Sequence, residues 1–565
     1  MYMMRKSIAI STLFTLKNNS NVFQSNQMRI KRYMSSLLAL ATAATVASAA
    51  PADGTGDGTG EAAAADSTAE DGFGINWSTE AIFTAGSHDF APYYIMSNNH
   101  GILSSSKDAL VRVAAKHDSQ RKNHFSYSFG VDLIGGYTSS VDYDRYYSTD
   151  PGAGAIPVTN GFMKAVSRHP SRFWIQQLYG EVRYRSIFLS VGMKEHSSAL
   201  LSPTLSSGDF VESGNARPIP EVRVGFSDFT DIPLTNGWVQ IQGELSYGKM
   251  TDNAWMREHY NYYNGHINQG ALYSYKRCYF RTKPAMPFSA TVGMQVGAFF
   301  GGETTSYING KEIRRVKFSR GLKQFFKVLI PSDGGLSYYS GSSLGCWDLQ
   351  FRYRFSNNSA LKAYMQKPFE DGSGIGFLNG FDGLWGLQYN TSGFPWIRSV
   401  VAEYLDFTNQ SGPMHWDPDD VPGTTIRRRA EGNDNYYYNH EYNAYANYGM
   451  AIGTPFLRSP IYNTDGVMEF TANRVRGFHI GMEGDVSRSL SWRLLGGYRV
   501  AYGWGGYLYQ HPKDDTSLML EAAWKPAGVK GLSFRAALAI DHGTLLGNNV
   551  GGMLTVRFND ILRIR

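Results

Sequence analysis

The stretch FSYSFGVDLIGGY, residues 125–137, decides the fold because apolar and polar side chains alternate along it. In an extended strand, alternate side chains point to opposite faces. One face therefore carries Phe125, Tyr127, Phe129, Val131, Leu133 and Tyr137, and the other carries Ser126, Ser128, Gly130 and Asp132. Strands of soluble sheets usually have about five or six residues, whereas about nine to eleven cross a bilayer at a tilt. This segment is predicted to span a membrane, with lipid on its aromatic side.

The same alternation recurs along the chain. It is clear in residues 288–300, 347–355, 492–504, 534–540 and 554–558, and weaker stretches lie near Trp174, Ile187, Val222, Val239, Leu272, Ala363, Trp385, Val401, Val475 and Leu518. A soluble β-sandwich also alternates, but it would bury the aromatic face in a core. The strand lengths favour a barrel, and roughly 16 to 18 strands are typical of porins. The predicted fold class is all-β: a transmembrane β-barrel of about 18 antiparallel strands with a small N-terminal periplasmic-side plug or cap.

The composition agrees with a chain that meets lipid. Charged residues make up 18%, below the roughly 25% of soluble domains, and 36 Tyr with 32 Phe outnumber 48 Asp plus Glu. Past the N-terminal region, no apolar run is long enough for a membrane-spanning helix. Because lipid cannot satisfy open sheet edges, a closed barrel is the remaining way to span. The formal charge of +6 comes from scattered basic residues, which gives no basis for nucleic-acid binding.

The N-terminal residues predict export. Residues 28–49 combine a basic start, an uncharged stretch and an Ala-Ser-Ala sequence, which is typical of a signal peptide cleaved after Ala49. Residues 1–27 are interpreted as a dispensable or mis-called leader, and residues 50–72 as a flexible acidic leader with too few apolar groups to fold. Residues 73–117 are irregular and are assigned to the plug or cap, which leaves residues 118–565 for the barrel. The predicted location is the outer membrane of a Gram-negative-type bacterium.

The predicted inner faces carry charges of both signs. In residues 492–504 the lipid side is Trp492, Leu494, Tyr498, Val500, Tyr502 and Trp504, with Arg493 and Arg499 opposite. The inward charges of the whole barrel are Arg183, Arg223, Arg352, Arg354, Arg493, Arg499, Arg535 and Arg557, with Asp132, Glu181, Glu221, Glu244, Asp348, Glu521 and Asp541. Both signs in similar number favour a wall of hydrogen bonds and salt bridges over an ion-selective track.

Three blocks of sequence carry a resemblance to a known family. They are VGMKEHSSALLSPTLSSGDFVESGNARPIPEVRVGF (191–226), SHDFAPYYIMSNNHGILS (87–104) and NYYYNHEYNAYANYGMAIGTPF (435–456), of which NARPIP (215–220) is the most specific part. The chain resembles the capsule-assembly Wzi family of outer-membrane proteins. The resemblance implies an 18-stranded barrel with an occluded lumen that acts as a lectin and holds secreted capsular polysaccharide on the cell surface. It departs from the family in residues 73–117, which are short for its periplasmic helical bundle, and in the C-terminal tail NDILRIR.

Two loop segments are rich in the side chains that polysaccharide recognition needs. Flat aromatic faces pack against sugar C–H groups, and polar side chains exchange hydrogen bonds with hydroxyls. The predicted ligand-binding residues are Trp255, His259, Tyr260, Tyr262, Tyr436, Tyr437, Tyr438, Asn439, His440, Tyr442 and Arg458. The alternative is that these rings pack the long loops into the lumen or form an interfacial girdle. If the capsule is acidic, Arg458 or the run Arg427, Arg428 and Arg429 supplies counter-charge, with a solvated loop face as the alternative use of that run.

The sequence favours a binding protein over an enzyme. It contains no HExxH motif or P-loop, and no cofactor or metal site is predicted. The expected function is attachment or organisation of capsular or other surface polysaccharide at the cell surface, with capsule-export machinery as a further candidate partner. The alternative is a substrate-selective porin with a conducting lumen.

Overall fold

The computed structural model describes residues 73–119, 124–148, 161–329, 341–370, 372–410, 434–505 and 507–564. The predicted signal peptide and acidic leader lie outside the described residues, as do Arg427, Arg428 and Arg429. None of the helices in the described ranges is long and apolar enough to cross a membrane.

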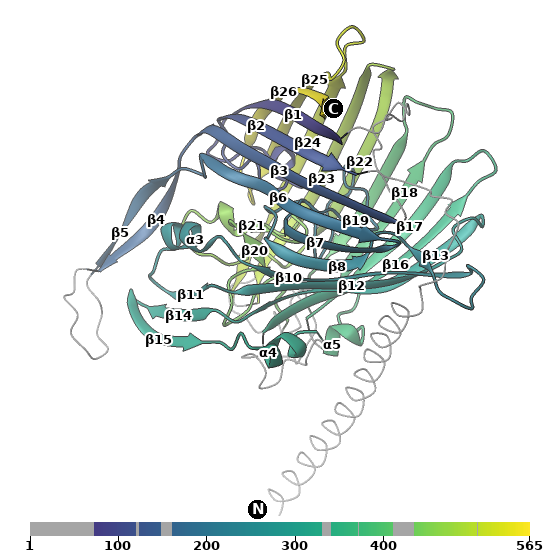
Figure 1. Cartoon of the computed structure of the whole chain (residues 1–565). Helices are drawn as coiled ribbons and strands as arrows, with labels where there is room; N and C mark the ends of the chain where they lie inside the picture. Colours follow the sequence, from purple (N-terminus) through teal and green to yellow (C-terminus); the bar gives the residue numbers. More distant parts are fainter. Residues whose placement is uncertain are drawn as a thin grey trace, which may run out of the picture.

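A closed antiparallel barrel dominates the structure (Figure 1). Over the described residues its 18 strands are β1 (Phe73–Gly86), β2 (Asp108–Asp118), β3 (Phe125–Thr138), β6 (Phe173–Tyr184), β7 (Ile187–Met193), β8 (Glu221–Phe226), β10 (Val239–Lys249), β12 (Leu272–Thr282), β13 (Phe288–Phe300), β16 (Ser342–Arg354), β17 (Ala360–Phe369), β18 (Gly383–Asn390), β19 (Ser399–Asp406), β22 (Val475–Ser487), β23 (Leu490–Trp504), β24 (Tyr507–Trp524), β25 (Leu532–Gly543) and β26 (Asn549–Ile564). Each strand pairs with the next in this order, and β26 pairs with β1 to close the sheet. The predicted all-β barrel of about 18 strands is confirmed, and every alternating segment named from the sequence falls in one of these strands.

The barrel begins at Phe73, well before the predicted boundary. The prediction that all of residues 73–117 form a plug or cap is wrong, because β1 pairs with β26 and β2, and β2 pairs with β3. The alternation in these two strands is masked because apolar side chains lie on both faces: Phe83 and Val111 are exposed, whereas Ile82 and Leu110 are buried. An inner face that packs against protein instead of water loses the period of two.

Short connections lie at one end of the barrel and long ones at the other. Residues 185–186 and 488–489 join strands at the end where β1 starts and β26 stops, whereas residues 87–107, 194–220 and 407–474 join strands at the opposite end. Bacterial outer-membrane barrels have short periplasmic turns and longer external loops. The long-connection end is therefore the outer end, and residues 87–107 enter the barrel from it, not from the periplasmic side as the sequence suggested.

The connection 87–107 carries a short helix that is seated inside the barrel. All four residues of α2 (Tyr93–Met96) are buried, and the helix packs against β24 and β25. The Tyr93 N–H donates to Asp541 Oδ2 at 2.9 Å, and the Tyr94 hydroxyl lies 2.8 Å from His479 Nδ1. These contacts fix α2 against the inner wall.

The other two long connections also pack inside the wall. Phe210 and Val211, from residues 194–220, join Tyr436 and Tyr437, from residues 407–474, in one buried cluster. Inward side chains of the strands, such as Tyr273, belong to the same cluster. Leu205 joins α2 in a second cluster with side chains of β3, β23, β24 and β25. The interior of the barrel is thus a packed core built from its own connections.

The two faces of β3 follow the predicted alternation, whereas those of β23 depart from it at one residue. In β3, Phe125, Phe129 and Tyr137 are exposed, whereas Asp132 is buried, as predicted. In β23 the register shifts between Ala501 and Gly503. A bulge of this kind re-aims the side chains that follow it. Tyr502, predicted on the lipid face, is instead buried against Leu508.

Most of the predicted inward charges are buried in ion-pair networks. The largest centres on Arg223, whose guanidinium lies 2.8 Å from Glu212, 2.7 Å from Glu221 and 2.7 Å from Glu244. Asp132, Glu181, Asp348, Arg499, Glu521 and Asp541 are also buried, whereas Arg535 and Arg557 are exposed. Ion pairs also hold Arg183, Arg493 and Arg499. Within the described part of the chain, Arg352, Arg354, Arg535 and Arg557 form no ion pair, so the predicted salt-bridged wall is present over part of the barrel.

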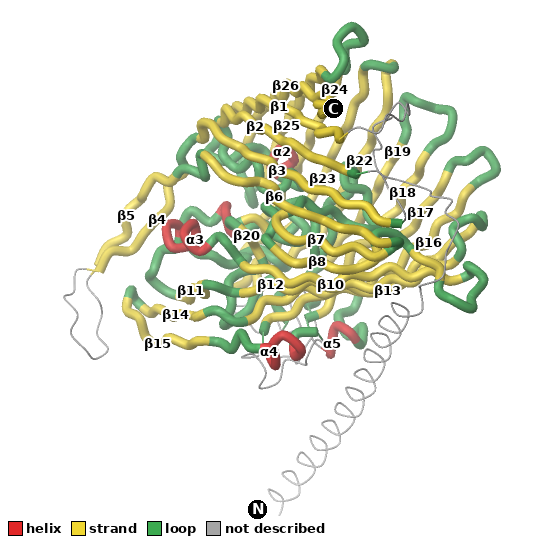
Figure 2. The backbone as a smooth tube through the Cα atoms, in the orientation of Figure 1, coloured by secondary structure: helices red, strands yellow, loops and turns green. Residues whose placement is uncertain are grey.

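Smaller elements lie at and beyond the outer end of the barrel. Figures 1 and 2 show the hairpin of β4 (Val141–Ser148) and β5 (Gly161–Arg168) projecting beyond it, near the sheet of β11 (Gly265–Gln269), β14 (Glu303–Ile308) and β15 (Lys311–Lys317). The remaining elements at this end are α3 (Asn253–His259), α4 (Leu322–Lys327), α5 (Gly372–Ile375), β20 (Ala446–Asn447), β21 (Met450–Ala451) and the 3-10 turn η3 (Pro460–Tyr462), whereas β9 (Thr230–Asp231) pairs with the start of β10 at the opposite end. Of these, α3 holds two of the predicted ligand-binding residues over the mouth of the barrel.

Candidate functional site

Four of the predicted ligand-binding tyrosines are core residues. Tyr260, Tyr436, Tyr437 and Tyr442 are 3%, 0%, 2% and 1% exposed. The Tyr436 hydroxyl donates to Asp382 Oδ2 at 2.9 Å, and the Tyr437 hydroxyl donates to the carbonyl of Phe210. These rings therefore hold the long connections in place and offer no surface to a sugar. For these four tyrosines the packing alternative is the one observed.

Tyr438, Asn439 and His440 lie at the outer end of β23. The ring of Tyr438 is half-buried, 5.4 Å from the Trp504 ring and edge-on to exposed His440 at 5.2 Å between centroids. Asn439 Oδ1 accepts the Glu441 N–H at 2.9 Å, so its side chain shapes the turn. Tyr262 is also half-buried, next to Tyr260 and Tyr307. These residues do not line the hollow described next.

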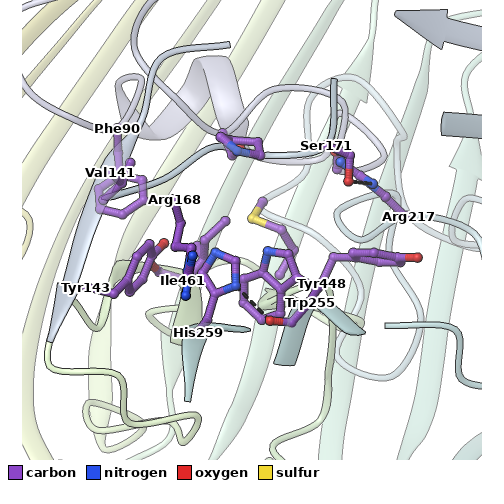
Figure 3. Close-up of a pocket in the computed structure, with 14 residues that line it drawn as sticks. Phe90, Val141, Tyr143, Arg168, Ser171, Arg217, Trp255, His259, Tyr448 and Ile461 are labelled. Atoms are coloured by element: carbon purple, nitrogen blue, oxygen red, sulfur yellow. Dashed lines mark hydrogen bonds between the residues drawn. The ribbon is translucent and has the colours of Figure 1, made fainter. Parts of the chain in front are cut away.

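A hollow at the outer end collects side chains from separate connections of the barrel (Figure 3). It contains Trp255 and His259, the two predicted residues on α3. The other lining residues are Phe90, Gly101, Ser104, Val141, Tyr143, Arg168, Pro170, Ser171, Arg217, Tyr448, Met450 and Ile461. We call this the mouth hollow. Its free volume is about 20 Å³, which leaves room for a small group but not for a whole sugar ring.

One wall of the mouth hollow is aromatic. The rings of Trp255 and His259 stack with centroids 4.1 Å apart, and Tyr143 meets His259 edge-on at 4.6 Å. The His259 Nδ1 lies 2.7 Å from the Trp255 carbonyl, and burial lowers the pKa of His259 to about 4. His259 is therefore a neutral ring at ordinary pH. Gly449, at φ +74°, leaves the room that the Trp255 ring needs, since a Cβ there would lie 2.4 Å from it.

The opposite side of the mouth hollow is cationic. The Arg217 guanidinium lies between two rings, 4.3 Å from the centroid of Trp174 and 4.6 Å from that of Tyr448. Its Nε donates to the Gly101 carbonyl at 3.3 Å and its Nη1 to the Ser171 hydroxyl at 3.1 Å, the latter drawn in Figure 3. Burial lowers the pKa of Arg217 to about 10, so this side chain remains charged.

A second hollow adjoins the first across Phe90, which lines both. It contains the predicted residue Arg458, together with His88, Asp89, Ala91, Tyr462, Thr464, Asp541, Leu546 and Asn549. The Arg458 Nη2 donates to the Tyr462 carbonyl at 2.7 Å, and the Tyr462 ring packs edge-on against Phe90 at 5.1 Å. The two hollows therefore form neighbouring compartments at the outer end.

The side chains of the mouth hollow suit binding more than catalysis. Its lining, as far as the chain is described, combines aromatic faces with guanidinium and hydroxyl donors and includes no carboxylate or thiol. The described residues also include no cluster of His, Cys, Asp and Glu that could hold a metal ion. Sequence reasoning missed Tyr143, Arg168, Arg217 and Tyr448, although Arg217 is part of the NARPIP block that carried the family resemblance.

Comparison with known proteins gives similarity at the level of structure. Neither a family model nor a curated protein sequence matches the chain. The similar solved structures include Wzi of Escherichia coli, a carbohydrate-binding β-barrel involved in group 1 capsule assembly, with 11% identity over 85% of this chain and 84% of that one and a TM-score of 0.49. They also include OccAB4 of Acinetobacter baumannii, with 10% identity over 86% and 98% of the two chains and a TM-score of 0.41, and OccD1 (OprD), with 10% identity over 87% and 97% and a TM-score of 0.40. The closed wall of the chain and its apolar outer face make the protein an outer-membrane β-barrel.

Proposed function

We propose that the protein binds capsular or other surface polysaccharide at its outer end and thereby attaches the polymer to the outer membrane. The observation that carries this proposal is the mouth hollow, where the half-buried rings of Trp255 and Tyr448 lie beside guanidinium and hydroxyl groups. Aromatic faces gain from burial against the C–H side of a sugar ring, and polar neighbours bond its hydroxyls. The family resemblance of the sequence blocks points to the same class of ligand. The proposed role is non-catalytic.

The filled interior favours a binding protein over a porin. Buried clusters built from three long connections occupy the inside of the wall. We expect the purified barrel to show almost no single-channel conductance in planar bilayers, because a conducting pore needs a water-filled path. Heat-modifiable migration in electrophoresis will confirm that the inserted protein is folded. Stepwise conductance from such a sample would favour a porin and count against a closed lumen.

Removing rings from the mouth hollow should release polymer from cells. We expect Trp255→Ala combined with Tyr448→Ala to weaken polysaccharide binding roughly tenfold or more, because each ring gives up aromatic contact with the sugar. Cell-attached polysaccharide should fall and shed polysaccharide should rise by a similar amount, with total synthesis unchanged. The measurement compares both fractions with those of a deletion strain.

A matched variant separates loss of binding from general damage. Trp396 is exposed and lies in residues 391–398, a short connection at the opposite end of the barrel. Trp396→Ala should therefore retain polysaccharide as the unchanged protein does. If the doubly substituted barrel is folded and its cells retain all their polysaccharide, the mouth hollow is not the attachment site.

A further inference from the structure

Arg217 is half-buried at the mouth hollow without a carboxylate beside it. Its guanidinium is enclosed by Trp174 and Tyr448 and donates to one carbonyl and one hydroxyl group. Across the described ranges of the chain no Asp or Glu forms an ion pair with Arg217, and its Nη2 has no hydrogen-bond acceptor. The lining of the hollow supplies no Asp or Glu either. The cation therefore faces the hollow with unused donors.

Holding the Arg217 charge in this hollow without a counter-charge raises the free energy of the folded protein. Burying a charge without a counter-charge is unfavourable, and the lowered pKa of Arg217 reports this cost. Arg223, six residues further on and more deeply buried, has this compensation, since three carboxylates surround it. An anion entering the mouth hollow would give Arg217 the same compensation.

A second cation faces the same space. Arg168, at the end of β5, lines the mouth hollow, and Figure 3 shows its side chain pointing toward His259. Its Nε donates to the backbone carbonyl of Glu258 at 3.3 Å, a contact that leaves its charge uncompensated. The titratable groups that line the hollow are two guanidinium groups, one imidazole ring and two phenols. Because the His259 imidazole is neutral, the charges among them are those of the two guanidinium groups. The electrostatic potential in the hollow is therefore positive.

We propose that the mouth hollow binds a carboxylate-bearing sugar, a uronic acid residue of an acidic polysaccharide, with Arg217 as the anchor of the carboxylate. A guanidinium presents parallel N–H groups that match the two oxygens of a carboxylate. The carboxylate group then enters the hollow, and the sugar ring lies across its rim, over the half-buried rings of Trp255 and Tyr448. This inference rests on the proposed function and specifies its ligand.

The test uses the full-length mature barrel in detergent and surface polysaccharide from the cells that produce it. The polysaccharide is cut to oligosaccharides, and half of the sample is carboxyl-reduced, so that each uronic acid becomes the neutral hexose. Calorimetric titration should show that the native oligosaccharides bind roughly ten- to a hundredfold more tightly than the reduced ones. The difference should shrink when the salt concentration rises.

Three variants assign the effect to residues. Arg217→Gln should abolish the preference for native over reduced oligosaccharides, and Arg168→Gln should reduce it in part. Arg257→Gln is the matched control, because Arg257 is exposed on α3 and does not line the mouth hollow. It should leave the preference unchanged. If Arg217→Gln does not fold, the binding of native and reduced oligosaccharides to the unchanged barrel and to Arg168→Gln still decides whether the hollow prefers a carboxylate.

The outcomes separate this inference from the proposed function. Equal binding of native and reduced oligosaccharides would overturn the carboxylate site and leave polysaccharide binding standing. A preference for the native form that survives Arg217→Gln would also overturn the role of Arg217. If neither form binds, the proposed function and the carboxylate site both fall.

Discussion

Replacing Arg223 by Met is expected to destabilise the barrel by about 3–5 kcal/mol, because three buried carboxylates would lose their shared counter-charge. The Arg223 side chain is 3% exposed and bonds Glu212, Glu221 and Glu244 at 2.7–2.8 Å. After the substitution, His196 at 3.1 Å from Glu221 and Arg277 at 3.3 Å from Glu244 would remain. The free energy of unfolding is measured by urea titration of the barrel in lipid vesicles.

Two further variants check the cause of this loss. Arg535→Met changes an exposed arginine on β25 and should alter the free energy of unfolding by less than about 0.5 kcal/mol. Adding Glu212→Gln to Arg223→Met removes one of the orphaned charges and should recover part of the loss. If Arg223→Met and Arg535→Met prove equally mild, the buried network contributes little to stability.

Leu538→Arg is expected to cost about 2–4 kcal/mol, because it places a charge on the lipid face near the bilayer midplane. Leu538 lies in the middle of β25, opposite Leu520 of β24, and its side chain is 71% exposed on the outer face. This position on the outer face of a long barrel strand is one that lipid is expected to cover. Folding and unfolding titrations in vesicles will measure the change.

The control for this substitution is a leucine that water surrounds. Leu234 is fully exposed in the short connection between β8 and β10, away from the predicted lipid belt. Leu234→Arg should therefore be nearly neutral in the same titration. A neutral Leu538→Arg would mean that the outer face of β25 does not contact hydrocarbon.

The barrel could be predicted because every strand has the same two environments, one on each face. Lipid on one side and polar groups on the other impose a period of two, which is visible in residues 125–137 without any knowledge of neighbours. The prediction of strands and of their lipid faces failed where side chains pack against protein inside the barrel or where a bulge interrupts a strand. Ile82 and Leu110 face α2 and its neighbours in one buried cluster, and the bulge near Tyr502 interrupts the alternation of β23.

The candidate site was predictable only in part. Trp255 and His259 were found because aromatic and polar residues are dense around them in the sequence. The same density in residues 435–449 selected tyrosines that serve the core, because composition alone does not distinguish a buried ring from a ligand-facing one. Arg217 is recognised as a site residue by its contacts with Gly101, Ser171 and Tyr448, which come from three other connections. No single stretch of sequence contains this arrangement.

The seam between β1 and β26 joins the two ends of the folded chain, and this governs how the molecule can be assembled. Tyr93 bonds Asp541 across 448 positions of sequence, so the seat of α2 is complete only after residues far along the chain have been made. Contacts between distant parts of a chain form slowly, and an unpaired strand edge invites association with other chains. One edge of β1 stays unpaired until β26 is in place. Closure of the wall and occupation of the interior are therefore a single late event, and the nascent protein is most vulnerable to misassembly until its final strand arrives.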